Sequence, residues 1–198
     1  FLKKEPGAEK FFHRFMGSEE FINDKKRFIL WLGEVTQDQL AKLPLCKERI
    51  ENVRDYRLSS SRAQTKKAAE YPNHFGTEII SKTNSIIVPR VSSERRYYIP
   101  IGFIESSTFC SDAALLIPEA SIFHYGILQS QTHNAWTRVV AGRLESRYRY
   151  SGSVVYNNFP WPTPSEDQKI EIEKYAQTVL DARKKYPDKS LAELYDPN

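Results

Sequence analysis

The chain has 198 residues, of which 40% are hydrophobic and 13% aromatic, and its formal net charge is +4. This size allows one large domain with an appendage. No stretch approaches the roughly 20 apolar residues of a membrane span, and no signal peptide opens the chain, so we expect a soluble, cytoplasmic protein with no membrane partner. The first residue is Phe1 rather than Met. We therefore expect a part of a longer polypeptide.

Cysteine and histidine usage argues against a metal centre. Cys46 and Cys110 are the two cysteines, neither of them in a C-x-x-C motif, and the four histidines are scattered without metal-ligand spacing. We expect both cysteines to be packed, reduced thiols, and we expect no metal site.

Basic charge is concentrated in the middle of the chain. Residues 45–100 hold 11 Lys and Arg against 6 Asp and Glu, whereas residues 164–198 hold 6 against 8. This asymmetry is typical of a surface that faces phosphate groups.

The N-terminal elements are predicted to be architectural. Residues 8–15 predict a short helix, and the apolar run 27–32 predicts a strand ending at Gly33. Thr36 is a suitable N-cap for a short helix that stops at Pro44.

Residues 45–69 predict an amphipathic helix, and the three serines at 59–61 mark a break in it. Its polar side includes Arg62, Lys66 and Lys67. These side chains suit contacts with a phosphate backbone, and a solvated helix face explains each of them equally well.

Residues 85–104 predict a hairpin of two strands, 86–89 and 97–104, rich in β-branched and aromatic residues. The connection carries Arg and Glu side chains, which hydrogen-bond guanine and cytosine edges respectively, and Ser hydroxyls, which suit bases or phosphates. The alternative is a solvated hairpin tip in which Glu94 pairs with an arginine. The connecting residues are Ser92, Ser93, Glu94, Arg95 and Arg96.

Residues 113–117 predict an apolar strand, and residues 120–141 predict the principal buried helix, which ends at Gly142. Arg143, Arg147 and Arg149 then alternate with apolar residues, which predicts a strand with one charged face. An apolar strand follows it in the segment SVVYNNFPWP (153–162), which turns into a proline-containing connection.

Residues 165–186 predict an amphipathic helix with Ser165 as N-cap, and residues 190–195 predict a further short helix. These elements indicate an α/β fold of the mixed α+β type. Short, mainly antiparallel strands pack on the long helix 120–141, with a helical C-terminal tail. We place the domain boundary between residues 1–162 and 163–198.

Several separated motifs resemble one family. They are RFMGSEEFI (14–22), VPRVSSERRYYIPIGFI (88–104), WTRVVAGRL (136–144), YRYSGSVVYNNFPWP (148–162) and SLAELYDP (190–197). In this order they resemble the target-recognition domain and C-terminal helical tail of MmeI-like (type IIG/IIL) restriction-modification enzymes and related DNA adenine methyltransferases.

The resemblance implies a DNA sequence-recognition module that positions duplex DNA for a methyltransferase domain of the same polypeptide. In the family that domain uses S-adenosylmethionine to methylate adenine N6, and many members also carry an endonuclease. This chain has no Asn-Pro-Pro-Tyr/Phe motif, Gly-rich cofactor loop or nuclease cluster. We therefore expect no catalysis and no bound cofactor in this chain.

The resemblance implies DNA contacts first for Ser92, Ser93, Glu94, Arg95 and Arg96. Phosphate contacts by Arg62, Lys66 and Lys67 come second, and contacts by Arg90, Arg143, Arg147 and Arg149 follow. The competing hypothesis is a protein-interaction or scaffolding domain that docks the parent enzyme's other domains. A stand-alone hydrolase is disfavoured because no G-x-S-x-G spacing is present.

Overall fold

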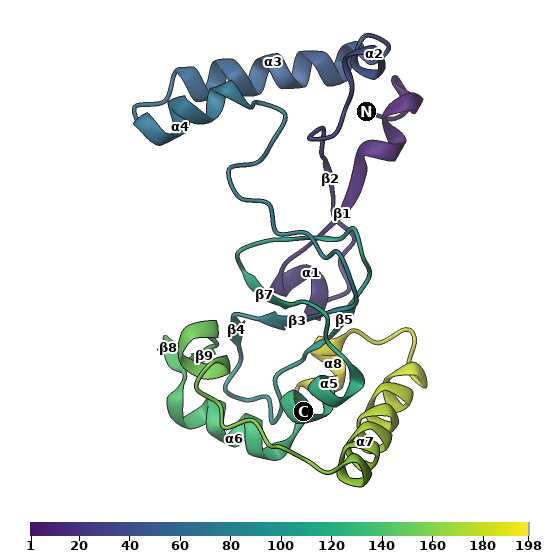
Figure 1. Ribbon diagram of the computed structural model, residues 1–198, viewed down its shortest axis with the longest axis vertical. Coiled ribbons are helices and arrows are strands. Elements are labelled where there is room, and N and C mark those ends of the chain that lie inside the picture. The colour runs from purple at the N-terminus through teal and green to yellow at the C-terminus, as the bar shows by residue number, and fades with distance from the viewer. Residues whose placement is uncertain (198) are drawn as a thin grey trace. The chain divides into compact units, whose positions relative to one another are not determined.

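The structure is a computed structural model that describes residues 1–197 (Figure 1). The chain divides into two compact units. The first unit consists of Phe1–Arg14 and Phe28–Glu78, and the second of Phe15–Arg27 and Ile79–Asn198. The fold is of the mixed α/β type with short, mostly antiparallel strands and a helical C-terminus, which confirms the predicted fold class.

The first unit is mainly helical. Phe12 of β1 lies opposite Leu30 of β2 in an antiparallel pair, so the helix predicted over residues 8–15 is wrong in its second half. The helix predicted over 45–69 is broken after Leu58, as the serines predicted. The elements are η1 (Pro6–Phe11), the first part of β1 (Phe12–Met16), β2 (Phe28–Leu30), α2 (Gln37–Leu40), α3 (Pro44–Leu58), α4 (Ala63–Lys67) and η2 (Ala68–Glu70).

A buried carboxylate fixes the start of α3. Glu5 accepts hydrogen bonds from the backbone N–H groups of Leu45 (2.8 Å) and Cys46 (3.0 Å), which have no partner within the helix. Burial alone would raise the pKa of Glu5, but the hydrogen bonds with Cys46 and with these amides outweigh it and lower the pKa. Cys46 and Cys110 are free and buried, as predicted.

The second unit contains the remaining strands and most of the buried core. β5, β3 and β7 form one antiparallel sheet, β4, β9 and β8 form another, and β6 pairs in parallel with the last two residues of β1. The elements are α1 (Ser18–Ile22), β3 (Ser85–Pro89), β4 (Val91–Ser92), β5 (Gly102–Ile104), β6 (Phe109–Cys110), β7 (Ala114–Ile117), α5 (Ile122–Gln129), α6 (Gln131–Val140), β8 (Gly142–Leu144), β9 (Arg147–Arg149), a π-helical turn (Gly152–Tyr156), α7 (Glu166–Lys184) and α8 (Leu191–Tyr195).

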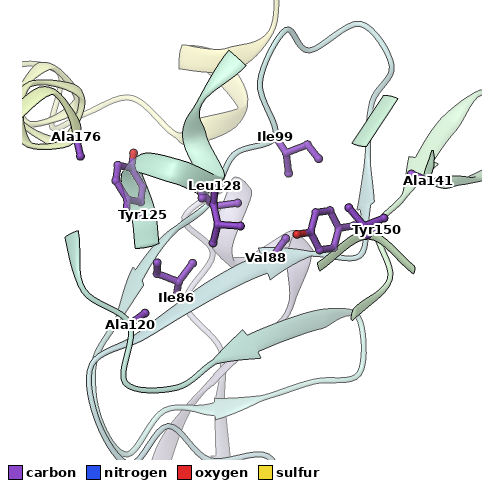
Figure 2. Packing of buried hydrophobic residues seen from close by; sticks show 11 residues of the cluster. Ile86, Val88, Ile99, Ala120, Tyr125, Leu128, Ala141, Tyr150 and Ala176 are labelled. Atoms are coloured by element: carbon purple, nitrogen blue, oxygen red, sulfur yellow. The ribbon is translucent and has the colours of Figure 1, made fainter. Parts of the chain in front are cut away.

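Strand β3 is buried on both faces. Ile86 and Val88 face a cluster that includes Tyr125 and Leu128 of α5 (Figure 2), whereas Ile87 belongs to a separate cluster on the opposite face. A continuous apolar run is what a strand covered on both sides requires. β3 is therefore the central strand of its sheet.

The predicted 86–89 and 97–104 hairpin is correct in its antiparallel pairing, because β3 pairs with β5 with Ile86 opposite Phe103. It is wrong in detail: the second strand is restricted to Gly102–Ile104. The connection also leaves the sheet, since β4 pairs with β9 instead.

The predicted buried helix over 120–141 is two helices, α5 and α6, which are separated at Ser130. Ser130 is extended (φ −66°, ψ 156°), and its hydroxyl accepts the N–H of His133 at 3.1 Å. Asn134 donates its side-chain amide to Ser130 O at 2.9 Å, so the interrupted backbone keeps a partner. Ser130 thus ends α5 and begins α6, because a serine side chain that caps a helix competes with continuation of the preceding helix.

Two predictions for the segment after α6 are wrong. Residues 143–149 form a hairpin, because Glu145 and Ser146 make a turn between β8 and β9. Residues 152–156 form a π-helical turn rather than a strand, and the Ser151 hydroxyl caps it by accepting the Val154 N–H.

The C-terminal helices occur where they were predicted. Ser165 caps α7 by accepting the Gln168 N–H, and α8 follows after residue 190. Ala176 of α7 joins the core beside Tyr125 (Figure 2), while Ile170 and Tyr175 remain exposed. Across residues 1–197, no helix is long and apolar enough to span a membrane.

Close packing of α5 on α7 depends on Gly126. A Cβ at this position would lie 2.9 Å from Ile172 Cγ2 and 3.1 Å from Ala176 Cβ. We expect Gly126→Val to lower the free energy of unfolding by about 1–3 kcal/mol through overpacking. Urea denaturation measures this change. The matched control is Gly142→Val, where a Cβ meets nothing within 4 Å; equal stability of the two variants would contradict the prediction.

Candidate nucleic-acid interface

The β4–β9–β8 sheet of the second unit gathers three of the predicted arginines. Arg147 and Arg149 are alternate residues of β9 and share one face of the sheet. Arg143 lies opposite Tyr148 and therefore on the other face, where its guanidinium is 3.8 Å from the centre of the Tyr148 ring. Arg147 and Arg149 thus form the exposed basic face, and Arg143 is engaged in a cation–π contact.

The β8–β9 turn places a carboxylate beside this basic face. Glu145 has φ 57°, a left-handed conformation that is unfavourable for a residue with a Cβ, and its side chain is 76% exposed. Its carboxylate forms an ion pair with the Arg147 guanidinium. An exposed acceptor and an exposed donor are therefore adjacent at the tip of the hairpin.

Glu94 connects the loop after β4 to the same turn. The pKa of Glu94 is lowered first by a hydrogen bond from its own backbone amide and second by the Ser146 hydroxyl, with Arg147 and Arg95 contributing through their charge. The loop 93–96 and the β8–β9 hairpin therefore form one continuous polar surface.

The other residues of the segment 92–96 differ in their burial and in their hydrogen bonds. Ser92 is 3% exposed and its hydroxyl has no hydrogen-bond partner in the described residues. Ser93 is half-buried and accepts the Arg95 N–H. Arg95 is exposed, whereas the Arg96 side chain is only 12% exposed. Of these residues, Glu94 and Arg95 are the ones that present side chains to solvent.

Arg90 lies between β3 and β4 and is half-buried. Its backbone N–H donates to Ala113 O, and its carbonyl accepts the N–H of Tyr150. Arg90 thus supports the junction of the two sheets through its backbone. Burial raises the pKa of Cys110 to about 11, and the charge of the Arg90 guanidinium opposes this only in part.

Arg62, Lys66 and Lys67 lie in the first unit, in or next to α4. Arg62 is the N-cap residue, and the two lysines occupy the last turn. All three are exposed, and their side chains have no ion-pair partner within residues 1–197. Their charges are therefore free to meet an anion from solvent.

Arg57 of α3 has the opposite role from these exposed cations. Its guanidinium donates to the carbonyl oxygens of Ala68 (2.7 Å), Tyr71 (2.8 Å) and His74 (2.6 Å). These bonds fix the path of the chain after α4. Arg57 is thus a structural arginine on a helix whose basic residues otherwise face solvent.

Comparisons with known proteins identify the family. The family model described as the MmeI target recognition domain matches residues 1–163, and the model of the MmeI C-terminal domain matches residues 164–198. The chain belongs to the MmeI target recognition domain family. This agrees with the resemblance drawn from the sequence motifs.

Two relatives of this MmeI-family chain are informative. DNA methyltransferase A of Bacillus subtilis (strain 168) is 40% identical over 197 residues, which is 100% of this chain and 22% of the relative. A solved structure of the type IIL restriction-modification enzyme MmeI in complex with DNA is 45% identical, with a TM-score of 0.94, over 100% of this chain and 26% of that chain. This chain thus spans about a quarter or less of either relative.

Sequence reasoning about this MmeI-family chain missed several residues of the surface. Glu145 and Ser146 carried a usable signal, because two polar residues between short apolar-basic runs predict a turn. Asp196, which lies 3.7 Å from Arg96, carried none, since the two are 100 positions apart.

Two grooves of this MmeI-family chain lack the acidic group that binds the ribose of a nucleoside cofactor. A groove of about 670 Å³ in the second unit and one of about 360 Å³ in the first are lined mainly by apolar and aromatic side chains. Neither has a carboxylate to bind ribose hydroxyls. Among residues 1–197, no cluster of three His, Cys, Asp or Glu side chains is arranged to hold a metal ion.

The hydrogen bond between Glu94 and the Ser146 hydroxyl predicts a measurable change in the pKa of Glu94 when that hydroxyl is removed. Its pKa is lowered in the folded state, so its contribution to loop order is present above its unfolded pKa of about 4.3 and is lost as the pH falls through the folded value. Ser146→Ala should raise the pKa of Glu94 toward its usual value. Carboxyl-carbon NMR titration tests this, with Ser106→Ala in an exposed turn as the control. An unchanged Glu94 pKa in Ser146→Ala would refute it.

Arg57 can be separated from the exposed arginines by its effect on stability. Arg57→Ala leaves three carbonyl groups without their donor, and we expect it to lower the free energy of unfolding of the first unit by about 1–3 kcal/mol. Arg54→Ala on the exposed side of the same helix is the control and should change it by less than about 0.5 kcal/mol. Chemical denaturation followed by circular dichroism distinguishes them; similar values would argue against the structural role.

Proposed function

We propose that this chain binds duplex DNA and reads its base sequence through the β4–β9–β8 sheet and the adjoining loop 93–96. The observation that carries this proposal is the gathering of guanidinium donors and carboxylate acceptors on one exposed surface, with Arg147 and Glu145 paired to each other. Arg147 and Arg149 share a face, and Glu94 and Glu145 lie beside them. Arginine binds guanine O6 and N7 bidentately, and glutamate accepts from cytosine N4, so this surface suits direct readout in the major groove.

The hairpin is well suited to enter a groove. A two-stranded ribbon fits the major groove of B-DNA, and β8 and β9 with their two-residue turn form such a ribbon. The left-handed Glu145 backbone at the turn fits a functional role, since strained residues cluster at binding sites. Among the residues of the 92–96 string, the exposed Glu94 and Arg95 are proposed to contact DNA directly. The buried Ser92 and Arg96 are proposed to shape the loop.

The first unit is proposed to bind the phosphate backbone. Arg62, Lys66 and Lys67 are exposed and unpaired, which suits contacts that add affinity without base preference. In the second unit, Arg90 and Arg143 are proposed as further DNA contacts. Arg143 presents a guanidinium already stacked on Tyr148, and such a flat cation suits a phosphate or a base edge.

We further propose that the parent protein is a DNA adenine-N6 methyltransferase or a type II restriction-modification enzyme. The Bacillus subtilis relative is named a DNA methyltransferase, and the structural relative is a restriction-modification enzyme bound to DNA. We propose that S-adenosylmethionine binds in a methyltransferase domain of the same polypeptide, since this chain covers only 22% of the relative that is named a DNA methyltransferase. We propose residues 1–162 as the recognition domain and residues 163–198 as the tail.

A second candidate function is docking of the parent's other domains. Ile170 and Tyr175 of α7 are 62% and 61% exposed and do not contribute to the core described above. Large apolar residues on an exposed helix face are typical of interaction surfaces. This role uses residues of α7 that are not among the proposed DNA contacts.

Arginine substitutions test the reading surface. Arg147→Ala and Arg149→Ala should each weaken binding to the cognate duplex by about 1–3 kcal/mol, because each removes a base contact. Lys66→Ala should instead weaken binding to all sequences and reduce the salt slope by about one unit. The measurement is fluorescence anisotropy at roughly 50 to 200 mM salt, with a cognate duplex selected from a random pool.

The control for this experiment is Lys174→Ala, which removes an exposed cation of α7 outside the proposed surface. It should leave the affinity unchanged. If Arg147→Ala and Arg149→Ala both bind as the control does, the reading surface has been placed wrongly. If the unmodified protein binds no duplex at either salt concentration, DNA binding itself is refuted.

A further inference from the structure

The end of the C-terminal tail contacts the loop proposed to read DNA. Asp196 Oδ2 lies 3.7 Å from Arg96 Nη2, and the carbonyl oxygen of Pro197 accepts a hydrogen bond from Arg95 Nη2 at 3.4 Å. Both contacts join residues about 100 positions apart within the second unit. The two adjacent arginines of the loop thus both contact the two residues that follow α8.

Arg96 is poorly satisfied without this contact. Its side chain is 12% exposed, and its Nε atom is buried with no hydrogen-bond partner in the described chain. A nearly buried guanidinium without its counter-charge is destabilising, because its charge is largely removed from water and has no other partner. Removal of the Asp196 carboxylate therefore favours movement of Arg96 toward solvent, and the loop 93–96 would move with it.

The tail is itself anchored to the core, so it can act as a fixed support. Arg183 of α7 donates to Ile101 O at 2.7 Å and to Gln129 Oε1 at 3.3 Å. The same guanidinium donates to the Tyr195 hydroxyl and lies 5.0 Å from the centre of the Tyr195 ring. Tyr195 immediately precedes Asp196, so α8 presents the carboxylate from a fixed position.

We infer that Asp196 is a positioning residue for DNA recognition: it holds Arg96 in place and thereby orders the loop that carries Glu94 and Arg95. This inference rests on the proposed function for its DNA-binding consequence. Asp196 itself need not touch DNA. Its effect is to order the loop before binding, which reduces the entropy that binding would otherwise cost.

The first test requires no DNA and uses the intact protein that carries this chain. The Arg95 amide donates to Ser93 Oγ and the Arg96 amide donates to Ser93 O, so their hydrogen exchange reports opening of the loop. Asp196→Asn should speed exchange at residues 93–97 about 3- to 10-fold while the β3 amides stay protected. Asp196→Glu, which keeps the carboxylate, should restore slow exchange.

The second test measures binding of the same variants to the cognate duplex and to a scrambled duplex. Asp196→Asn should weaken cognate binding about 3- to 10-fold, with scrambled binding and the salt slope unchanged, because no phosphate contact is removed. Asp188→Asn is the matched control, since it makes the same change at an exposed tail residue that has no ion pair within residues 1–197. It should behave as the unmodified protein does.

The outcomes separate the inference from the proposed function. Unchanged exchange at residues 93–97, or cognate affinity equal to that of Asp188→Asn, overturns the positioning role. Faster exchange throughout the second unit with equal loss of cognate and scrambled binding also overturns it, because that pattern indicates general destabilisation. Absence of duplex binding by the unmodified protein refutes the proposed function and the binding consequence together. Loss of binding in Arg147→Ala but not in Asp196→Asn refutes only the positioning role.

Discussion

The second unit depends on the burial of β3 on both faces. Ile86 and Val88 face α5, and Ile87 faces the opposite cluster, so both sides of the sheet must be covered for this strand to be stable. Covering one side requires α5 and, behind it, α7, which comes 80 residues later in the chain. The proposed reading surface begins where this strand ends, because β4 follows β3 after a single residue. The surface is therefore built outward from a rigid core.

The C-terminal helices are part of that construction. Gly126 permits the close approach of α5 and α7. The Arg183 guanidinium donates hydrogen bonds to the Ile101 carbonyl just before β5, to Gln129 of α5 and to Tyr195 of α8. A partly buried guanidinium with several fixed acceptors has little freedom to move, so Arg183 fixes the positions of α5, α7 and α8 relative to one another. The tail is thus integrated with the second unit, and Ile170 and Tyr175 of α7 remain exposed.

Arginines in this chain divide into structural and exposed groups. Arg57 and Arg183 satisfy backbone carbonyls, and Arg96 is nearly buried, whereas Arg147 and Arg149 face solvent on one side of β9. The division follows from packing rather than from residue type, since a guanidinium serves equally well as a carbonyl clamp or a base reader. This is the physical basis for restricting the proposed base contacts to the exposed group.

Local patterns of apolar, capping and turn residues were sufficient to predict the fold class, the N-caps at Thr36 and Ser165 and the break near residue 60, and the sequence motifs carried the family resemblance. The split at Ser130 was not predicted, although it is a local event in which the Ser130 hydroxyl caps α6. Packing of the chain as a whole decided that β4 pairs with β9 in the second sheet. It also decided which arginines are buried. Each of these depends on contacts between residues far apart in the chain, such as Arg96 with Asp196, and no local pattern encodes such a contact.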